Sequence, residues 1–189
     1  MAVAYDIKAH PTVYGSRQFR SRLEAKWASF FDLCGWQFEY EPYDLPGWSP
    51  DFLLGRDVLV EVKPISAFDE DVARKMTGAA RAAKWDGELL LLGVSPLFEM
   101  DYGPFDSPAI GWLGQKTGPE GDLAETWSFD RASACISRGE GLPDFAHAMF
   151  SYRMRMFDGY WKQNDWHDDS RWLKSIWDRA ANRVQWQKK

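Results

Sequence analysis

Three side chains with the chemistry of a hydrolytic site lie close together in the sequence: Asp51, Glu61 and Lys63. Residues two apart in a β-strand point to the same face, so Glu61 and Lys63 should lie side by side while Val62 points into the core. The segment Gly55-Arg56-Asp57 suits a tight turn. Such a turn would fold the two strands into a hairpin and bring Asp51 near Glu61.

This combination of side chains predicts metal-dependent hydrolysis of phosphodiester bonds. Mg²⁺ prefers oxygen ligands and keeps several waters, so two or three carboxylates suffice to hold it. A divalent cation can activate water and neutralise charge on a phosphate. The ammonium of Lys63 would orient the attacking water and stabilise the charge that develops. We therefore expect Mg²⁺ or Mn²⁺ as the cofactor, held by Asp51 and Glu61, with the Val62 carbonyl as a further ligand.

A fourth candidate, Glu24, lies on a helix predicted over residues 16–35. Ser16 can cap its start and Gly35 can end it, and apolar residues recur between them at helical spacing. A carboxylate at the edge of the buried face can reach over a sheet to the metal site, directly or through water. The alternative is that Glu61 and Lys63 form a surface ion pair and that Asp51 is a turn residue.

The remaining pattern predicts an α/β fold with a mixed central sheet flanked by helices. Besides the helix at 16–35, helices are expected at 68–85, 143–157 and 169–187. Strands are expected at 36–40, 51–54, 58–62, 88–94, 110–113 and 126–129. We divide the single domain into a core, residues 1–142, and a tryptophan-rich helical extension, residues 143–189. The last helix carries an apolar stripe formed by Leu173, Ile176, Trp177, Ala180 and Val184.

Basic residues gather in two places although the net charge of the chain is −5. From residue 170 to the end there are six basic residues and one acidic residue, a local charge of +5. A second group surrounds Glu24. Either group can be a solvated helix face, but basic patches beside carboxylates suit binding to a phosphate backbone. The DNA-binding candidates are Arg17, Arg20, Arg22, Lys84, Arg179 and Arg183.

Other features exclude several classes of protein. Two cysteines are too few for a cysteine-only zinc site or a four-cysteine iron–sulfur cluster, and three scattered histidines argue against a histidine-rich zinc hydrolase. No apolar run approaches the length that spans a bilayer, and the first residues do not form a secretory signal. These observations lead us to expect a soluble, cytoplasmic protein with no membrane partner. Four residues near the C-terminus could coordinate a second metal ion, but we expect them to form an exposed acidic loop that caps the last helix: Asp165, His167, Asp168 and Asp169.

Four short motifs resemble the PD-(D/E)XK nuclease superfamily: Ser21-Arg22-Leu23-Glu24, Phe38-Glu39-Tyr40-Glu41, Pro50-Asp51-Phe52-Leu53-Leu54 and Val60-Glu61-Val62-Lys63. The resemblance is closest to phage endonuclease I, which resolves Holliday junctions, and looser to TnsA-like transposon nucleases. It covers residues 16–64, about a quarter of the chain. It implies a restriction-endonuclease-like core in which Asp51 and Glu61 bind the metal, Lys63 assists hydrolysis and Glu24 completes the site.

The function expected from these patterns is that of a DNA endonuclease of phage or mobile-element type, with roles in recombination or transposition. One alternative is a non-catalytic DNA-binding or assembly module that keeps the nuclease fold. Another is a protein-interaction module that uses the tryptophan-rich C-terminal helices, whose aromatic rings can also stack on unpaired bases. The sequence leaves open the choice between endo- and exonuclease, the preference for DNA or RNA, and the oligomeric state, with a dimer among the options.

Overall fold

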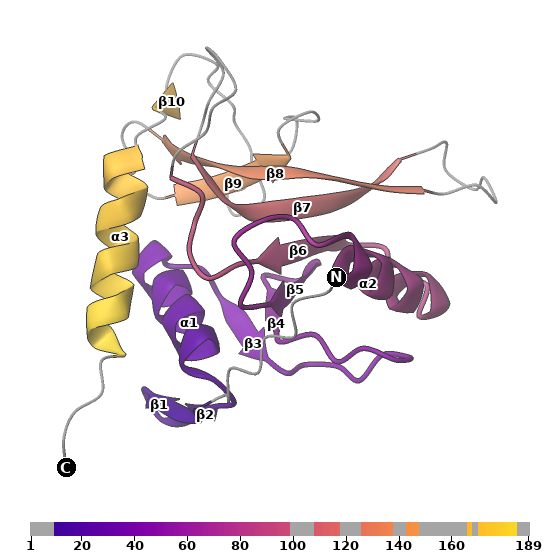
Figure 1. Ribbon diagram of the computed structural model, residues 1–189, viewed down its shortest axis with the longest axis horizontal. Helices are drawn as coiled ribbons and strands as arrows, with labels where there is room; N and C mark the ends of the chain where they lie inside the picture. Colours follow the sequence, from indigo (N-terminus) through magenta and orange to yellow (C-terminus); the bar gives the residue numbers. More distant parts are fainter. Residues whose placement is uncertain are drawn as a thin grey trace.

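The computed structural model describes residues 10–98, 108–117, 126–137, 143–147, 166–167 and 170–184. These residues form three helices, a mixed sheet of eight strands and a separate hairpin (Figure 1). The helices are α1 (Arg22–Cys34), α2 (Glu70–Ala82) and α3 (Ser170–Arg183). The hairpin consists of β1 (Thr12–Tyr14) and β2 (Arg17–Phe19). The strands of the sheet are β3 (Phe38–Tyr40), β4 (Phe52–Leu54), β5 (Val58–Val62), β6 (Glu88–Leu92), β7 (Ala109–Thr117), β8 (Thr126–Ser137), β9 (Pro143–His147) and β10 (Trp166–His167).

The sheet runs in the order β10-β8-β7-β6-β5-β4-β3, with β9 also paired to β8. Strands β5 and β6 are parallel, and α2 connects them in the chain. The other strand pairings in the described sheet are antiparallel. The predicted α/β class with a mixed central sheet is therefore confirmed. Strand β5, which carries Glu61, lies inside the sheet between β4 and β6, whereas β3 forms one edge.

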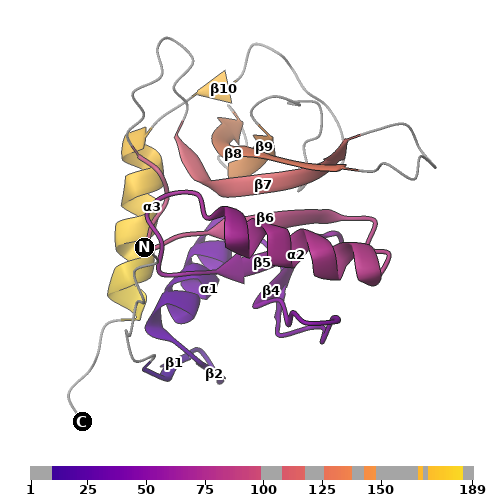
Figure 2. The ribbon, with the colours of Figure 1, turned by 45° about the vertical axis from the view of Figure 1, so that its right-hand side comes forward.

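Side chains of alternate residues in the strands enter two different hydrophobic clusters, one on each face of the sheet. Val58, Val60 and Val62 of β5 pack in the cluster that includes α1 and α3. Leu59 packs in the second cluster, where α2 contributes Met76. Figures 1 and 2 both show α1 and α3 side by side on one face and α2 on the other. Because Glu61 alternates with Val60 and Val62, its side chain lies on the α2 face, and Val62 points into the core as predicted.

Helices α1 and α3 share one hydrophobic core. The predicted apolar stripe of the last helix is buried in full, from Leu173 to Val184. The ring centres of Trp27 and Trp177 are 4.5 Å apart, and the ammonium of Lys26 lies 3.8 Å from the centre of the Trp177 ring. The Trp27 indole N–H donates to the Gly93 carbonyl oxygen at 2.9 Å, which ties α1 to the residue just after β6. Within the described ranges, no helix is long and apolar enough to cross a membrane.

The helix predicted over residues 16–35 is wrong at its start. Residues 17–19 form β2 of a hairpin whose turn contains Gly15 in a left-handed conformation, with φ of 58°. The helix begins five residues later than expected, because Ser21 and not Ser16 is the N-cap and accepts a hydrogen bond from the Glu24 N–H. Gly35 ends it as predicted, in a left-handed conformation.

The helix predicted over residues 143–157 is also wrong where the structure describes it. Residues 143–147 form β9, which pairs with β8 in the register Ala132↔His147. Pairing with β8 overrides the local helical pattern. Residues 148–157 lie outside the described residues, as do Asp165, Asp168 and Asp169 of the acidic group near the C-terminus. The short strand predicted at 110–113 is confirmed as part of β7, and the one at 126–129 as part of β8.

Candidate metal and phosphate site

Asp51 lies immediately before β4 and is held rigidly from both sides. Its N–H donates to the Val60 carbonyl oxygen and its carbonyl oxygen accepts from the Glu41 N–H, both at 2.9 Å. These bonds continue the antiparallel ladder one residue beyond β4. The side chain is buried, and its Oδ2 accepts a hydrogen bond from the Val62 N–H at 2.7 Å. The hairpin predicted from Gly55 therefore forms, and it fixes one carboxylate oxygen of Asp51 against β5.

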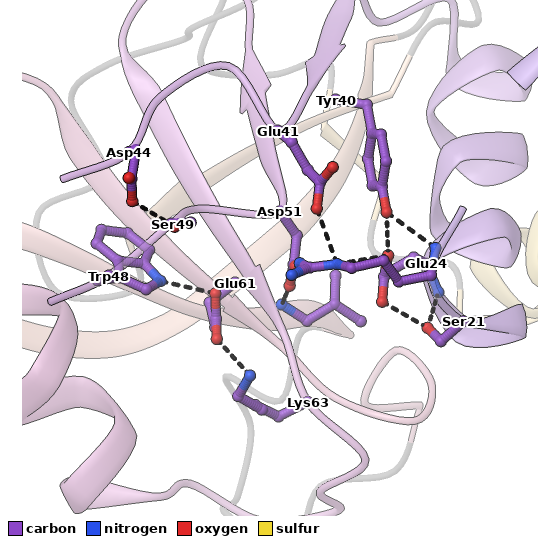
Figure 3. Close-up of polar contacts among 12 residues, drawn as sticks. Ser21, Glu24, Tyr40, Glu41, Asp44, Trp48, Ser49, Asp51, Glu61 and Lys63 are labelled. Carbon is purple, nitrogen blue, oxygen red and sulfur yellow. Dashed lines mark hydrogen bonds and ion pairs between the residues drawn. The ribbon is translucent and has the colours of Figure 1, made fainter. Parts of the chain in front are cut away.

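Glu61 is buried on β5 and contacts two side chains from different directions (Figure 3). Its Oε2 accepts a hydrogen bond from the Trp48 indole Nε1 at 2.7 Å. Its Oε1 forms an ion pair with Lys63 Nζ. The expected position of Lys63 beside Glu61 on one face of β5 is therefore confirmed. The contact with Trp48, which lies in the loop between β3 and β4, was not expected from the sequence.

Glu24 lies in the first turn of α1 and is buried. The Ser21 hydroxyl accepts from the Glu24 N–H at 3.1 Å and donates to Glu24 Oε1 at 2.7 Å. The Tyr40 hydroxyl donates to Glu24 Oε2 at 2.6 Å. A carboxylate near a helix N-terminus is also favoured by the helix dipole. Glu24 is thus fixed by its own helix cap and by the edge strand β3.

Arg20 connects carboxylates from three parts of the chain. Its Nη2 contacts Asp51 Oδ1, and its Nε lies 2.8 Å from Glu41 Oε1 and 3.8 Å from Glu24 Oε2. Its backbone N–H donates to the Tyr40 hydroxyl at 3.0 Å. Partial burial acts to lower the pKa of Arg20, but the charges of Asp51, Glu24 and Glu41 outweigh it and raise the pKa above its ordinary value. Glu41 itself adopts a left-handed backbone conformation, with φ of 49°.

Negative charge is in excess around Asp51. Burial raises the pKa of its carboxyl to about 7, and the charges of Glu61 and Glu24 add to this effect. The hydrogen bond from Val62 and the charge of Lys63 act in the opposite direction and are outweighed. A group in this environment gains from a bound cation, because the cation removes the repulsion that favours protonation.

The oxygens of Asp51 and Glu61 divide into two kinds. One oxygen of each carboxylate is anchored by a neutral donor, the Val62 N–H or the Trp48 indole. The other contacts a cationic side chain, Arg20 or Lys63. In the described part of the chain, no three acidic, histidine or cysteine side chains are arranged as a ready-made metal site. The donor chemistry still fits Mg²⁺ or Mn²⁺, because two carboxylate oxygens already face positive charge.

No protein-family model, curated protein or solved structure matches the chain.

The basic residues expected to bind DNA lie in three places. Arg17 lies in β2, Arg20 lies just before α1 and Arg22 begins it, all close to Glu24 in the chain. Lys84 is exposed just after α2. Arg179 and Arg183 are exposed on α3, and the charge of Arg179 acts on the thiol of Cys34, at the opposite end of α1 from Glu24. The structure thus brings Arg20 of the first group to the carboxylates and places Arg179 elsewhere.

Arg17 also lines a surface hollow of about 550 Å³ between the β1–β2 turn, the end of α1 and the start of β3. Its guanidinium carbon lies 5.9 Å from the centre of the Tyr40 ring, and the hydroxyl of Tyr40 binds Glu24. The hollow is therefore connected to Glu24 through Arg17 and Tyr40.

Sequence reasoning missed several residues that hold the site in place: Ser21, Tyr40, Glu41 and Trp48. The spacing of Ser21 and Glu24 matches a helix-capping pattern and could have identified both the cap and their contact. Tyr40 and Glu41 belong to a motif that also carries the resemblance, but nothing local shows that they face Glu24 and Arg20. Trp48 stands in a loop rich in proline and glycine, where its partner is set by folding and not by spacing.

Proposed function

We propose that this chain is a divalent-metal-dependent deoxyribonuclease with a PD-(D/E)XK nuclease core. The observation that carries the proposal is the placement of Asp51, Glu61 and Lys63 at the neighbouring ends of β4 and β5. Both carboxylates are buried and anchored, and the ammonium contacts the oxygen of Glu61 that has no neutral donor. The order helix, three antiparallel strands, helix and parallel strand also supports the nuclease core.

Bound Mg²⁺ or Mn²⁺ would supply Lewis acidity toward the phosphate and the attacking water. Asp51 and Glu61 would hold it through the oxygens that now contact Arg20 and Lys63. Glu24 would complete the site directly or through water, and the Val62 carbonyl is a further candidate ligand. The Val62 N–H keeps Asp51 oriented, so the backbone of β5 contributes to the site whether or not its carbonyl does.

Lys63 would position the water and stabilise the charge that develops on the phosphate. Its contact with Glu61 holds the ammonium beside that carboxylate. Arg17, Arg20 and Arg22 would bind neighbouring phosphates of the backbone. In support, Arg20 contacts Asp51, Arg22 begins α1 and Arg17 lies over the ring of Tyr40. The narrower assignment, an endonuclease of phage or mobile-element type, rests on the motif resemblance and depends on which substrate is cut.

The test is cleavage of supercoiled plasmid, linear duplex, single strand and a four-way junction with Mg²⁺, Mn²⁺ or EDTA. We expect metal-dependent cutting that disappears in Lys63→Ala and persists in Lys75→Ala, a matched control at an exposed position on α2. Cutting that survives Lys63→Ala would move the chemistry to another site. DNA binding by the wild type without any cutting would favour the alternative of a non-catalytic module.

A further inference from the structure

We infer that Arg20 occupies the place of the divalent cation in the metal-free protein and is displaced from the carboxylates when the cation binds. The inference rests on the proposed metal site and adds a step that the site requires. Binding of metal and release of the arginine would be one coupled event.

The contacts of Arg20 are those of a substitute cation. Its guanidinium reaches Asp51 Oδ1, the one oxygen of that carboxylate not held by the Val62 N–H. The same group lies near Glu41 and Glu24, so it offsets charge from three carboxylates at once. A planar guanidinium presents five N–H donors in a rigid fork, a geometry that suits bridging several carboxylates. A cation that used Asp51 Oδ1 as a ligand would compete directly with it.

The burial of the two partners shows which of them can move. The side chain of Arg20 is 53% exposed, whereas that of Asp51 is 4% exposed. The Asp51 backbone is fixed by hydrogen bonds to Val60 and Glu41, and its Oδ2 by Val62. The arginine can therefore swing into solvent while the carboxylate stays in place. Its backbone, bonded to the Tyr40 hydroxyl, keeps the released side chain beside the site, where it can bind a phosphate of the substrate.

The inference predicts two effects of one substitution: one on the affinity for Mn²⁺, and one on the coupling between Mn²⁺ and DNA. Without the guanidinium, the cation no longer has to displace it, so Arg20→Gln should tighten Mn²⁺ binding by about tenfold, as expected for the loss of a charge-assisted contact. The released side chain should also couple the binding of Mn²⁺ to the binding of DNA. DNA should therefore tighten Mn²⁺ binding more when Arg20 is present than in Arg20→Gln. This coupling is measured in the Lys63→Ala background to prevent cleavage.

The experiment is calorimetric titration of the folded, metal-free protein with Mn²⁺. Arg22→Gln is the matched control, because it removes the same charge two residues away from an exposed side chain that starts α1. Arg20→Ala is measured with added guanidinium chloride at a concentration below that which unfolds the protein, and with sodium chloride at the same ionic strength. We expect guanidinium, and not sodium, to weaken Mn²⁺ binding in this variant by filling the vacated place.

The outcomes separate this inference from the proposed function. If the wild type binds Mn²⁺ and Arg20→Gln binds it no more tightly than Arg22→Gln does, Arg20 is not a competing cation, and the metal site stands without it. Equal effects of guanidinium and sodium on Arg20→Ala would also overturn the inference. If neither the wild type nor Arg20→Gln binds Mn²⁺, the proposed metal site is itself wrong.

Discussion

Replacing Asp51 by asparagine should stabilise the metal-free protein while abolishing its response to metal. Burial and the charges of Glu61 and Glu24 raise the pKa of Asp51 from 3.8 to about 7. At about 1.4 kcal/mol per pKa unit, this difference corresponds to roughly 4 kcal/mol of destabilisation when the carboxylate is charged. Asparagine keeps an acceptor for the Val62 N–H but loses the ionic contact with Arg20, which costs about 1–2 kcal/mol. The net gain should be about 2 kcal/mol at pH 8.

The gain should depend on pH in a defined direction. The folded protein holds the Asp51 proton up to about pH 7, whereas the unfolded chain releases it near 3.8. Between these values the folded state binds more protons, so the stability of the wild type falls as pH rises through this window. The Asp51→Asn variant would have no such proton, and the difference between variant and wild type should grow from pH 4 to pH 8 and be smallest at the acidic end.

Thermal and urea unfolding in EDTA measure this prediction. A gain of about 2 kcal/mol should raise the melting temperature by roughly 4–8 °C in a protein of this size. Added Mg²⁺ should raise the melting temperature of the wild type and leave that of Asp51→Asn unchanged. The control is Asp32→Asn, at an exposed position on α1, which should alter neither. If the variant is no more stable than the wild type at pH 8 in EDTA, the charged Asp51 carboxylate does not destabilise the folded protein, and the reasoning is refuted.

Two further substitutions test other contacts of the site and core. Trp48→Phe removes the indole N–H that anchors Glu61 and should weaken Mn²⁺ binding by about tenfold or more, as for partners that orient a metal ligand. Trp85→Phe is its control in the same hydrophobic cluster, and equal Mn²⁺ affinities of the two variants would contradict a positioning role for Trp48. Trp177→Ala should lower the free energy of unfolding by about 3–5 kcal/mol in urea titrations, because the ring packs on Trp27 and Phe30. Ser175→Ala, on the exposed side of α3, should change stability little, and a comparable loss in both variants would show that α3 is not part of the core.

The parts of the site that could be predicted depend on short-range patterns. Two short apolar runs, with the turn segment Gly55-Arg56-Asp57 between them, were enough to predict the hairpin that brings Asp51 beside β5. Period-two geometry was enough to place Lys63 beside Glu61. Both features depend on fewer than about fifteen residues of chain, a range over which local geometry decides the structure.

The parts that were missed depend on distant partners or on competing local signals. Ser16 and Ser21 can both cap a helix, and the correct start at Ser21 follows from its reciprocal bonding with Glu24. Strand β9 is set by pairing with β8, so its helix-like composition was misleading. The contacts of Trp48 with Glu61 and of Tyr40 with Glu24 join residues 13 and 16 positions apart through the packing of a loop and an edge strand. No periodicity in the sequence encodes them.

The interior position of β5 determines how short a working fragment of this protein can be. All four residues of the candidate site lie before residue 64, but β5 pairs on one side with β6, which ends at Leu92. The Trp27 indole is bonded to Gly93, so α1 also depends on chain beyond β6. A fragment that stops after Lys63 would contain every motif, but β5 would then be an edge strand, paired with β4 and without β6. During synthesis, β5 therefore lacks its β6 partner until more than twenty-five residues beyond Lys63 have been added.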